Sequence, residues 1–158
     1  MSPPSPPSRP RPSGPLRIDI QGGEPSRLRL DVPSDVEYVG EAVDLVARHC
    51  LTGTLSPRRV LFNLRTALAE ALTNAIVYGN GGDVAKVVRV QVELGRDAIR
   101  IRVSDDGGGF DPAAPPDPTR PENVAREDGR GLFVMRHLVD HVDFNDKGNS
   151  ICLTLQAG

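Results

Sequence analysis

Three segments of the 158-residue chain combine residue types and spacings that could carry chemistry. The first contains Glu70 and Asn74, which are four residues apart and would share one face of a helix. A carboxylate can accept a proton, and an amide oxygen is a hard ligand, so the pair suits a magnesium–phosphate site. The same spacing fits an ordinary solvated helix edge, so spacing alone leaves both interpretations open.

The second segment is a strand end that runs into glycines. Asp105 and Asp106 follow a strand pattern rich in β-branched residues, and Gly107, Gly108 and Gly109 come next. Glycines let the backbone approach a ligand closely, and a carboxylate there can accept a hydrogen bond from an exocyclic amine such as that of adenine. The alternative is a plain turn that ends the strand.

The third segment opens a predicted helix with Gly129, Arg130, Gly131 and Leu132. Backbone N–H groups at a helix start favour anions, and the arginine adds a positive charge, so a phosphate would fit there. This Gly-x-Gly is weak evidence by itself. It lacks the third glycine and the preceding βαβ unit of the dinucleotide fingerprint.

The elements that must position these segments follow two periodicities. Alternation of apolar and polar residues predicts six strands, at 16–20, 28–32, 84–94, 98–103, 142–145 and 151–155. Helical spacing predicts three helices, at about 34–50, 57–78 and 131–139. The fold class is therefore α+β: a two-layer sandwich whose mixed, mostly antiparallel sheet carries three helices on one face.

Two details of these helices are specific enough to be checked. We expect Ser34 to cap the first helix, with Glu37 three residues later completing a capping box. The apolar stripe predicted for the second helix includes Leu61 together with Leu64, Leu68 and Leu72.

Proline clusters set the predicted domain limits. Seven of the fifteen prolines lie in residues 1–15, which predicts a disordered tail or, less readily, a proline-rich ligand for an aromatic groove. Residues 16–158 would form one domain. Five further prolines lie in 111–121, inside a long irregular connection, and such connections are usually functional lids or disordered insertions.

Composition excludes several classes of protein. Lysine plus arginine number 19 against 21 aspartate plus glutamate, a net charge of −2, which argues against nucleic-acid and membrane-surface binding. The sequence has no run of 18 apolar residues and no signal-peptide pattern. Cys50 and Cys152 are far apart in the sequence, which argues against a disulfide framework. The reducing cytoplasm is the expected compartment for a protein without disulfides. His137 and His141 could share a helix face, but they make only a weak metal candidate.

In combination, the three segments resemble the GHKL (Bergerat-type) ATP-binding fold. Within that superfamily the chain is most similar to the bacterial anti-sigma-factor serine/threonine protein kinases. The resemblance covers about residues 26–156 and is carried by E-A-L-T-N-A at 70–75, V-S-D-D-G-G-G-F-D-P at 103–112 and G-R-G-L-F-V-M at 129–135.

The resemblance implies a role for each matching residue. Glu70 matches the general base that takes a proton from a serine hydroxyl of the protein substrate. Asn74 matches the magnesium ligand, and Asp105 matches the carboxylate that receives the adenine amine. The glycine-rich segments match as well. Gly107 and Gly109 match the hinge of the pocket wall. The second segment, with Gly129, Arg130, Gly131 and Leu132, matches the one that holds phosphates at a helix start. Residues 110–128 correspond to the mobile ATP lid.

Two positions depart from the family pattern. Tyr78 stands where the family often has histidine, and Asn149 stands where a threonine helps to hold adenine. Ser150 is the other residue that could replace that threonine, and the sequence does not decide between them.

The function implied by the resemblance is that of an anti-sigma factor with kinase activity. It would use ATP and Mg²⁺ to phosphorylate an anti-sigma-factor antagonist, bind a sigma factor and form a homodimer in the cytoplasm, without direct contact to nucleic acid or membrane. The alternative is a nucleotide-gated binding protein without phosphotransfer, which the intact Glu70 and Asn74 disfavour. A histidine-kinase catalytic domain is a third reading, but the region before residue 26 is too short and proline-rich to supply its dimerisation helices.

Overall fold

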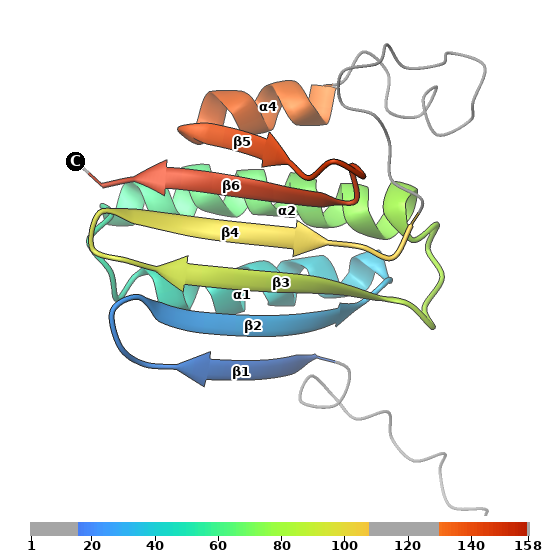
Figure 1. Cartoon of the computed structure of the whole chain (residues 1–158), viewed down its shortest axis with the longest axis horizontal. Coiled ribbons are helices and arrows are strands. Elements are labelled where there is room, and N and C mark those ends of the chain that lie inside the picture. Colours follow the sequence, from blue (N-terminus) through green and yellow to red (C-terminus); the bar gives the residue numbers. More distant parts are fainter. Residues whose placement is uncertain (1–15, 108–129, 158) are drawn as a thin grey trace, which may run out of the picture.

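One six-stranded sheet organises the computed structural model of the chain, which describes residues 16–107 and 130–157 (Figure 1). The strand order is β1-β2-β3-β4-β6-β5, and each neighbouring pair of described strands is antiparallel. The strands are β1 (Arg17–Gln21), β2 (Ser26–Pro33), β3 (Val87–Leu94), β4 (Ala98–Ser104), β5 (His141–Phe144) and β6 (Ser150–Gln156). The predicted tail at 1–15 and the predicted lid at 110–128 lie outside the described residues.

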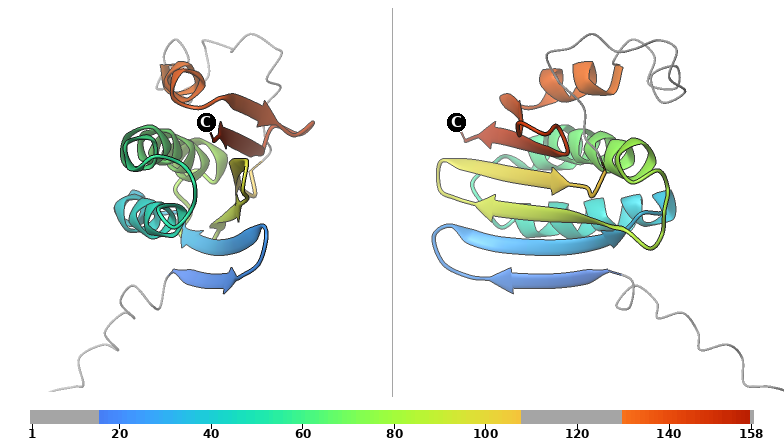
Figure 2. Two further views of the ribbon diagram at one scale, coloured as in Figure 1. Left: turned by 90° about the vertical axis from the view of Figure 1, so that its left-hand side faces the viewer. Right: turned by 45° about the vertical axis from the view of Figure 1, so that its right-hand side comes forward.

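All described helices lie on one face of this sheet (Figure 2). A single 3-10 turn, η1 (Val36–Tyr38), leads into α1 (Val39–Cys50). A long helical stretch follows, built from η2 (Arg59–Leu64), α2 (Arg65–Asn74) and η3 (Ala75–Gly79), with π-type hydrogen bonds in its first and last parts. The last helix is α4 (Arg130–Leu138). This arrangement confirms the predicted α+β two-layer class.

The core lies between the sheet and the helices because each strand buries every second side chain. β2 buries Leu28, Leu30 and Val32, while the alternate arginines and aspartate face away from the helices. The long helical stretch contributes fully buried leucines to the same core, including Leu68 and Leu72. This burial of apolar surface is the main source of the domain's stability.

The long helical stretch passes a simple test for membrane spans. Arg59–Gly79 has 21 residues and a mean hydropathy of 1.2, which is long and apolar enough to cross a membrane by length and composition alone. Many of its apolar residues, such as Leu64, Leu68 and Leu72, belong to the core of the domain, and 44% of the tested window is buried inside the protein. A helix that packs against a sheet in this way is a core helix, so the finding is weak evidence for a membrane span.

Several local predictions were wrong for tertiary reasons. Ser34 does not cap the first helix: Asp35 does, accepting a hydrogen bond of 2.9 Å from the Glu37 N–H, while the Ser34 hydroxyl is buried elsewhere. Leu61 is 52% exposed and lies outside the apolar stripe. His137 lies on α4 but His141 begins β5, so they do not share a helix face.

The start of β3 was also misplaced. The strand begins at Val87, three residues after the predicted start at Val84. The intervening residues form a turn in which the Asp83 carboxylate accepts a hydrogen bond from the Ala85 N–H and the Asp83 carbonyl accepts one from the Lys86 N–H. Aspartate side chains that bond to the backbone two residues later favour such turns over strands.

Candidate functional site

The first part of the candidate site lies where α2 meets the start of α4. Glu70 and Asn74 lie on one face of α2, as their spacing predicted, and both are half-buried. A β-carbon placed on Gly131 would lie 3.1 Å from Glu70 Oε2 and 3.3 Å from Asn74 Nδ2. Glycine therefore leaves the first turn of α4 open toward both polar side chains.

The packing of α4 explains why its start faces these two side chains. At its other end, Asn63 Nδ2 donates a 3.0 Å hydrogen bond to the Leu138 carbonyl oxygen. α4 therefore runs antiparallel to the long helical stretch. Its buried anchor is Met135, which is 2% exposed. The N-terminus of α4, where backbone N–H groups and the helix dipole favour an anion, is thus held beside Glu70 and Asn74.

The second part of the candidate site is the end of β4, where Asp105 is buried at 9% exposure. Its carboxylate packs against Gly79, since a β-carbon on Gly79 would collide with both carboxylate oxygens. Asp105 Oδ1 accepts a 2.8 Å hydrogen bond from the Gly107 N–H. A β-carbon on Gly107 would in turn collide with the Gly79 carbonyl oxygen. Both glycines are therefore required for this close approach of helix end and strand end.

The electrostatics of Asp105 differ from those of an exposed aspartate. Burial raises the pKa of its carboxyl group above the ordinary value. The hydrogen bond from the Gly107 N–H opposes this rise, the neighbouring charge of Asp106 adds to it, and the charges of Arg89 and Lys147 oppose it. A buried carboxylate of this kind gains from any ligand that donates a hydrogen bond to it.

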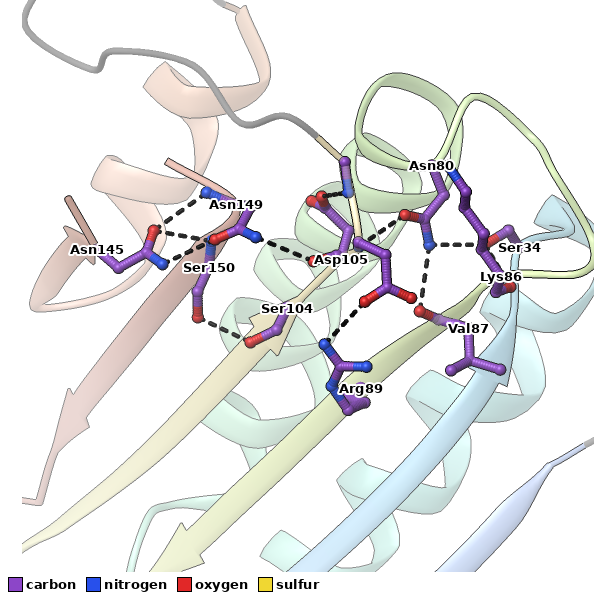
Figure 3. Close-up of polar contacts among 12 residues, drawn as sticks. Ser34, Asn80, Lys86, Val87, Arg89, Ser104, Asp105, Asn145, Asn149 and Ser150 are labelled. Carbon is purple, nitrogen blue, oxygen red and sulfur yellow. Dashed lines mark hydrogen bonds and ion pairs between the residues drawn. The ribbon is translucent and has the colours of Figure 1, made fainter. Parts of the chain in front are cut away.

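The last hairpin supports the Asp105 backbone from the opposite side (Figure 3). The Asp105 N–H donates to the Asn149 carbonyl oxygen at 2.9 Å, and Asn149 Nδ2 donates to the Asp105 carbonyl oxygen at 3.3 Å. The Ser150 hydroxyl instead pairs with the Ser104 hydroxyl at 2.8 Å. Of Asn149 and Ser150, Asn149 is thus the residue that hydrogen-bonds to Asp105.

The two parts lie along one helical stretch. Glu70 and Gly79 are nine residues apart, which corresponds to about 13 Å along a helix axis. An extended nucleoside triphosphate is comparable in length. A ligand of that length would reach from Asp105 to Asn74 and the start of α4.

Not every predicted site residue falls within the described part of the chain. Gly109 and Gly129 lie outside the described residues, and Arg130 is described only as the first residue of α4. Leu132 packs partly buried against the core, so its contribution is to seat α4. Tyr78 is half-buried one residue before Gly79, and its role stays a prediction.

Sequence reasoning missed the buried hydrogen bond between Asn80 and Ser34 and the 3.0 Å ion pair between Arg89 and Asp106. Asn80 is 3% exposed, although it stands in a Gly-Asn-Gly-Gly segment that is typical of an exposed turn. Its burial depends on which strands meet at the helix end. Local sequence carries no signal for that meeting.

A magnesium ion would fit only with help from a bound nucleotide. Among the described residues there is no group of three or more His, Cys, Asp or Glu side chains that could hold a metal. Mg²⁺ usually keeps several waters and takes one or two protein oxygens plus substrate phosphates, so the Asn74 amide oxygen fits it on those terms. Both cysteines are free, and burial raises the pKa of the Cys50 thiol to about 12.

Comparisons with known proteins point to one family. A family model described as the histidine kinase-like ATPase domain matches residues 32–155. A serine-protein kinase named RsbW from Oceanobacillus iheyensis is 29% identical over 130 residues, which cover 76% of this chain and 79% of the relative.

Two further serine-protein kinases named RsbW are similar over the same region. The protein from Listeria monocytogenes is 28% identical over 139 residues, covering 81% of this chain and 85% of the relative. The protein from Staphylococcus aureus is 29% identical over 140 residues, covering 80% and 84%. These matches confirm the resemblance stated from the three sequence segments.

Proposed function

The chain belongs to the histidine kinase-like ATPase domain family, and from this premise we propose that it is an ATP-dependent serine/threonine protein kinase. The observation that carries the proposal is the meeting of Glu70, Asn74 and the glycine-opened start of α4. The names of the three relatives described above, each a serine-protein kinase at 28–29% identity, support the same class of activity.

In the proposed reaction, Glu70 acts as the general base. It accepts the proton of a substrate serine hydroxyl while that oxygen attacks the γ-phosphorus of ATP. The new O–P bond forms as the bond between the γ-phosphorus and the bridging oxygen breaks, and ADP leaves. Phosphoryl transfer needs mainly positioning and charge neutralisation, so a single base next to an anion-binding helix start is sufficient machinery.

The remaining residues bind and orient the nucleotide. Asn74 would hold Mg²⁺, which supplies charge neutralisation on the phosphates when bound. Backbone N–H groups of Gly131 and Leu132 at the start of α4 would receive phosphate oxygens, together with Gly129 and Arg130. The Asp105 carboxylate would accept a hydrogen bond from the adenine amine, while Gly107 and Gly109 allow the pocket wall to bend around the base.

The partners belong to the same proposal. The protein would phosphorylate an anti-sigma-factor antagonist and bind a sigma factor in the cytoplasm, with no direct contact to nucleic acid or membrane. It would act as a homodimer, for which the edge strand β1 offers Ile18 and Ile20, 46% and 55% exposed, to a second copy. Partner choice would change with the bound nucleotide. A nucleotide that binds more tightly to the complex with one partner than to the complex with the other shifts the equilibrium between the two complexes.

Phosphotransfer can be tested with a pair of matched variants. Purified protein is incubated with γ-labelled ATP, Mg²⁺ and candidate antagonist proteins from the source organism, and labelled serine is identified by mass spectrometry. Glu70→Gln should lower the transfer rate by about 100-fold or more while nucleotide affinity changes little, because a general base acts in the transition state. Glu41→Gln, on α1, is the control and should behave as wild type.

Two results would redirect the proposal. Wild-type transfer rates in Glu70→Gln would remove Glu70 from the role of base. Binding of nucleotide and of partners without any transfer by the wild-type protein would favour the alternative, a nucleotide-gated binding protein.

A further inference from the structure

One buried side-chain amide connects the helix end and three strand ends beside Asp105 (Figure 3). Asn80 Nδ2 donates to Ser34 Oγ at 2.9 Å and to the Val87 carbonyl oxygen at 3.2 Å. Asn80 Oδ1 accepts a 2.8 Å hydrogen bond from the Asp106 N–H. Asn80 is 3% exposed, so its amide is shielded from water, and its bond to Ser34 Oγ is buried.

The partners of Asn80 come from the ends of three neighbouring strands, β2, β3 and β4. Ser34 directly follows β2, Val87 begins β3, and Asp106 follows β4 by two residues. Asn80 itself directly follows Gly79, the residue against which the Asp105 carboxylate packs. A single amide therefore fixes the helix end and the strand end on which Asp105 depends.

We propose that Asn80 is a positioning residue of the adenine subsite, holding the turn at residues 105–107 against Gly79 so that the Asp105 carboxylate faces the base. The inference rests on the proposed nucleotide-binding function and deepens it. Asn80 does not touch the nucleotide in this account; it acts through the Asp106 N–H on the residue next to it.

The geometry explains why the effect should be on base binding rather than on folding alone. Without the Asn80 side chain, Asp106 keeps its ion pair with Arg89 at 3.0 Å, and Asp105 keeps its two backbone contacts with Asn149. The turn therefore stays attached to the sheet. What it loses is the bond that ties it to the helix end, so the carboxylate shifts relative to Gly79.

The test compares Asn80→Ala with Ser34→Ala, a control from the same buried network. Ser34 is 1% exposed, and its hydroxyl accepts a hydrogen bond from Asn80 and donates one of 2.8 Å to the Lys86 carbonyl oxygen; both partners lie outside the turn at residues 105–107. Calorimetric titration with ADP and with GDP gives affinity and stoichiometry for each variant. A purely structural role would lower the folded fraction, and so the stoichiometry, but leave the affinity of folded molecules unchanged.

We expect Asn80→Ala to weaken ADP binding by about tenfold or more and to reduce the preference for ADP over GDP, because the Asp105 carboxylate is then no longer held in place to accept a hydrogen bond from adenine. Ser34→Ala should keep both values within about twofold of wild type. Equal affinity and equal base preference in wild type and Asn80→Ala would overturn the inference.

A measurement on the wild-type protein covers the case in which Asn80→Ala fails to fold. Adenosine, which lacks phosphates, probes the base subsite alone. Its addition should shift the NMR signals of the Asn80 side-chain amide and the Asp106 N–H, and inorganic triphosphate should not. Adenosine binding that leaves both signals in place would overturn the inference, while failure of the wild type to bind ADP at all would instead overturn the proposed function.

Discussion

Gly131→Ala tests whether the space between α2 and the start of α4 is used for phosphates. The new methyl group would lie 3.1 Å from Glu70 Oε2 and 3.3 Å from Asn74 Nδ2, closer than most real contacts of a β-carbon. Both neighbours are side chains on a helix surface, so a shift of a few tenths of an ångström can relieve the contact. We therefore expect a folded protein in which the new methyl group blocks the proposed phosphate site.

The stability of this variant should change little or rise. Alanine is favoured over glycine in a helix interior by about 1 kcal/mol, and by less in the first turn. Gly40→Ala on α1 is the matched control, because a β-carbon there meets no atom within 4 Å. Its unfolding free energy should rise by up to about 1 kcal/mol, and its activity should remain that of wild type.

The function of Gly131→Ala should fall steeply. The methyl group would fill space proposed for the phosphates, and displacing a reacting phosphate by about 1 Å can cost roughly 100-fold in rate, which is about 2.7 kcal/mol of transition-state free energy. Urea unfolding and the labelled-phosphate transfer assay, run on both glycine variants, measure the two effects separately. Normal transfer and ADP affinity in Gly131→Ala would refute the placement of phosphates at the start of α4.

Three further predictions use the same folded domain. Asp105→Asn should be at least as stable as wild type at pH 7, because burial raises the pKa of the carboxyl group and ionising that group in the folded state costs free energy. The difference in unfolding free energy between the two proteins should close as pH falls through the raised pKa. In calorimetry at pH 7, the affinity of Asp105→Asn for ADP should be at least about tenfold weaker than that of wild type. Asp140→Asn should cost less than about 1 kcal/mol at neutral pH, because the Gln156 N–H and then Arg59 hold the pKa of that carboxyl below its usual range while solvent screens both contacts. In urea unfolding the difference should persist above pH about 4 and vanish as pH falls through the lowered pKa. Leu72→Ala, at a fully buried position, should cost about 2–5 kcal/mol of unfolding free energy, whereas Leu51→Ala, at 39% exposure, should cost far less in the same urea series.

Periodicity predicted the elements of this fold because it reports local geometry. Alternating residues such as Leu28 and Leu30 belong to a strand that buries one face, and the Glu70–Asn74 spacing belongs to a helix face; both predictions hold in the structure. The order of the three motif segments pointed to the family that the comparisons then matched.

What the sequence could not predict depends on contacts between distant segments. Ser34 has the residue type and position of a helix cap, yet Asn80 and Lys86 engage its hydroxyl from 46 and 52 residues away. Leu61 fits an apolar stripe, but the part of the helix that bears it has π-type hydrogen bonds, and the side chain is exposed. The proximity of Gly131 to Glu70 follows from how α4 packs, which no local pattern encodes.

The central claim is that the chain binds an adenine nucleotide between Asp105 and the start of α4. The most direct test is a calorimetric titration of the wild-type protein with ADP and with GDP, each in the presence of Mg²⁺. The account predicts saturable heat at one ADP per chain and binding of GDP at least about tenfold weaker, since the Asp105 carboxylate accepts a hydrogen bond that guanine's carbonyl cannot donate. Absence of saturable heat, or equal affinity for the two nucleotides, would contradict it.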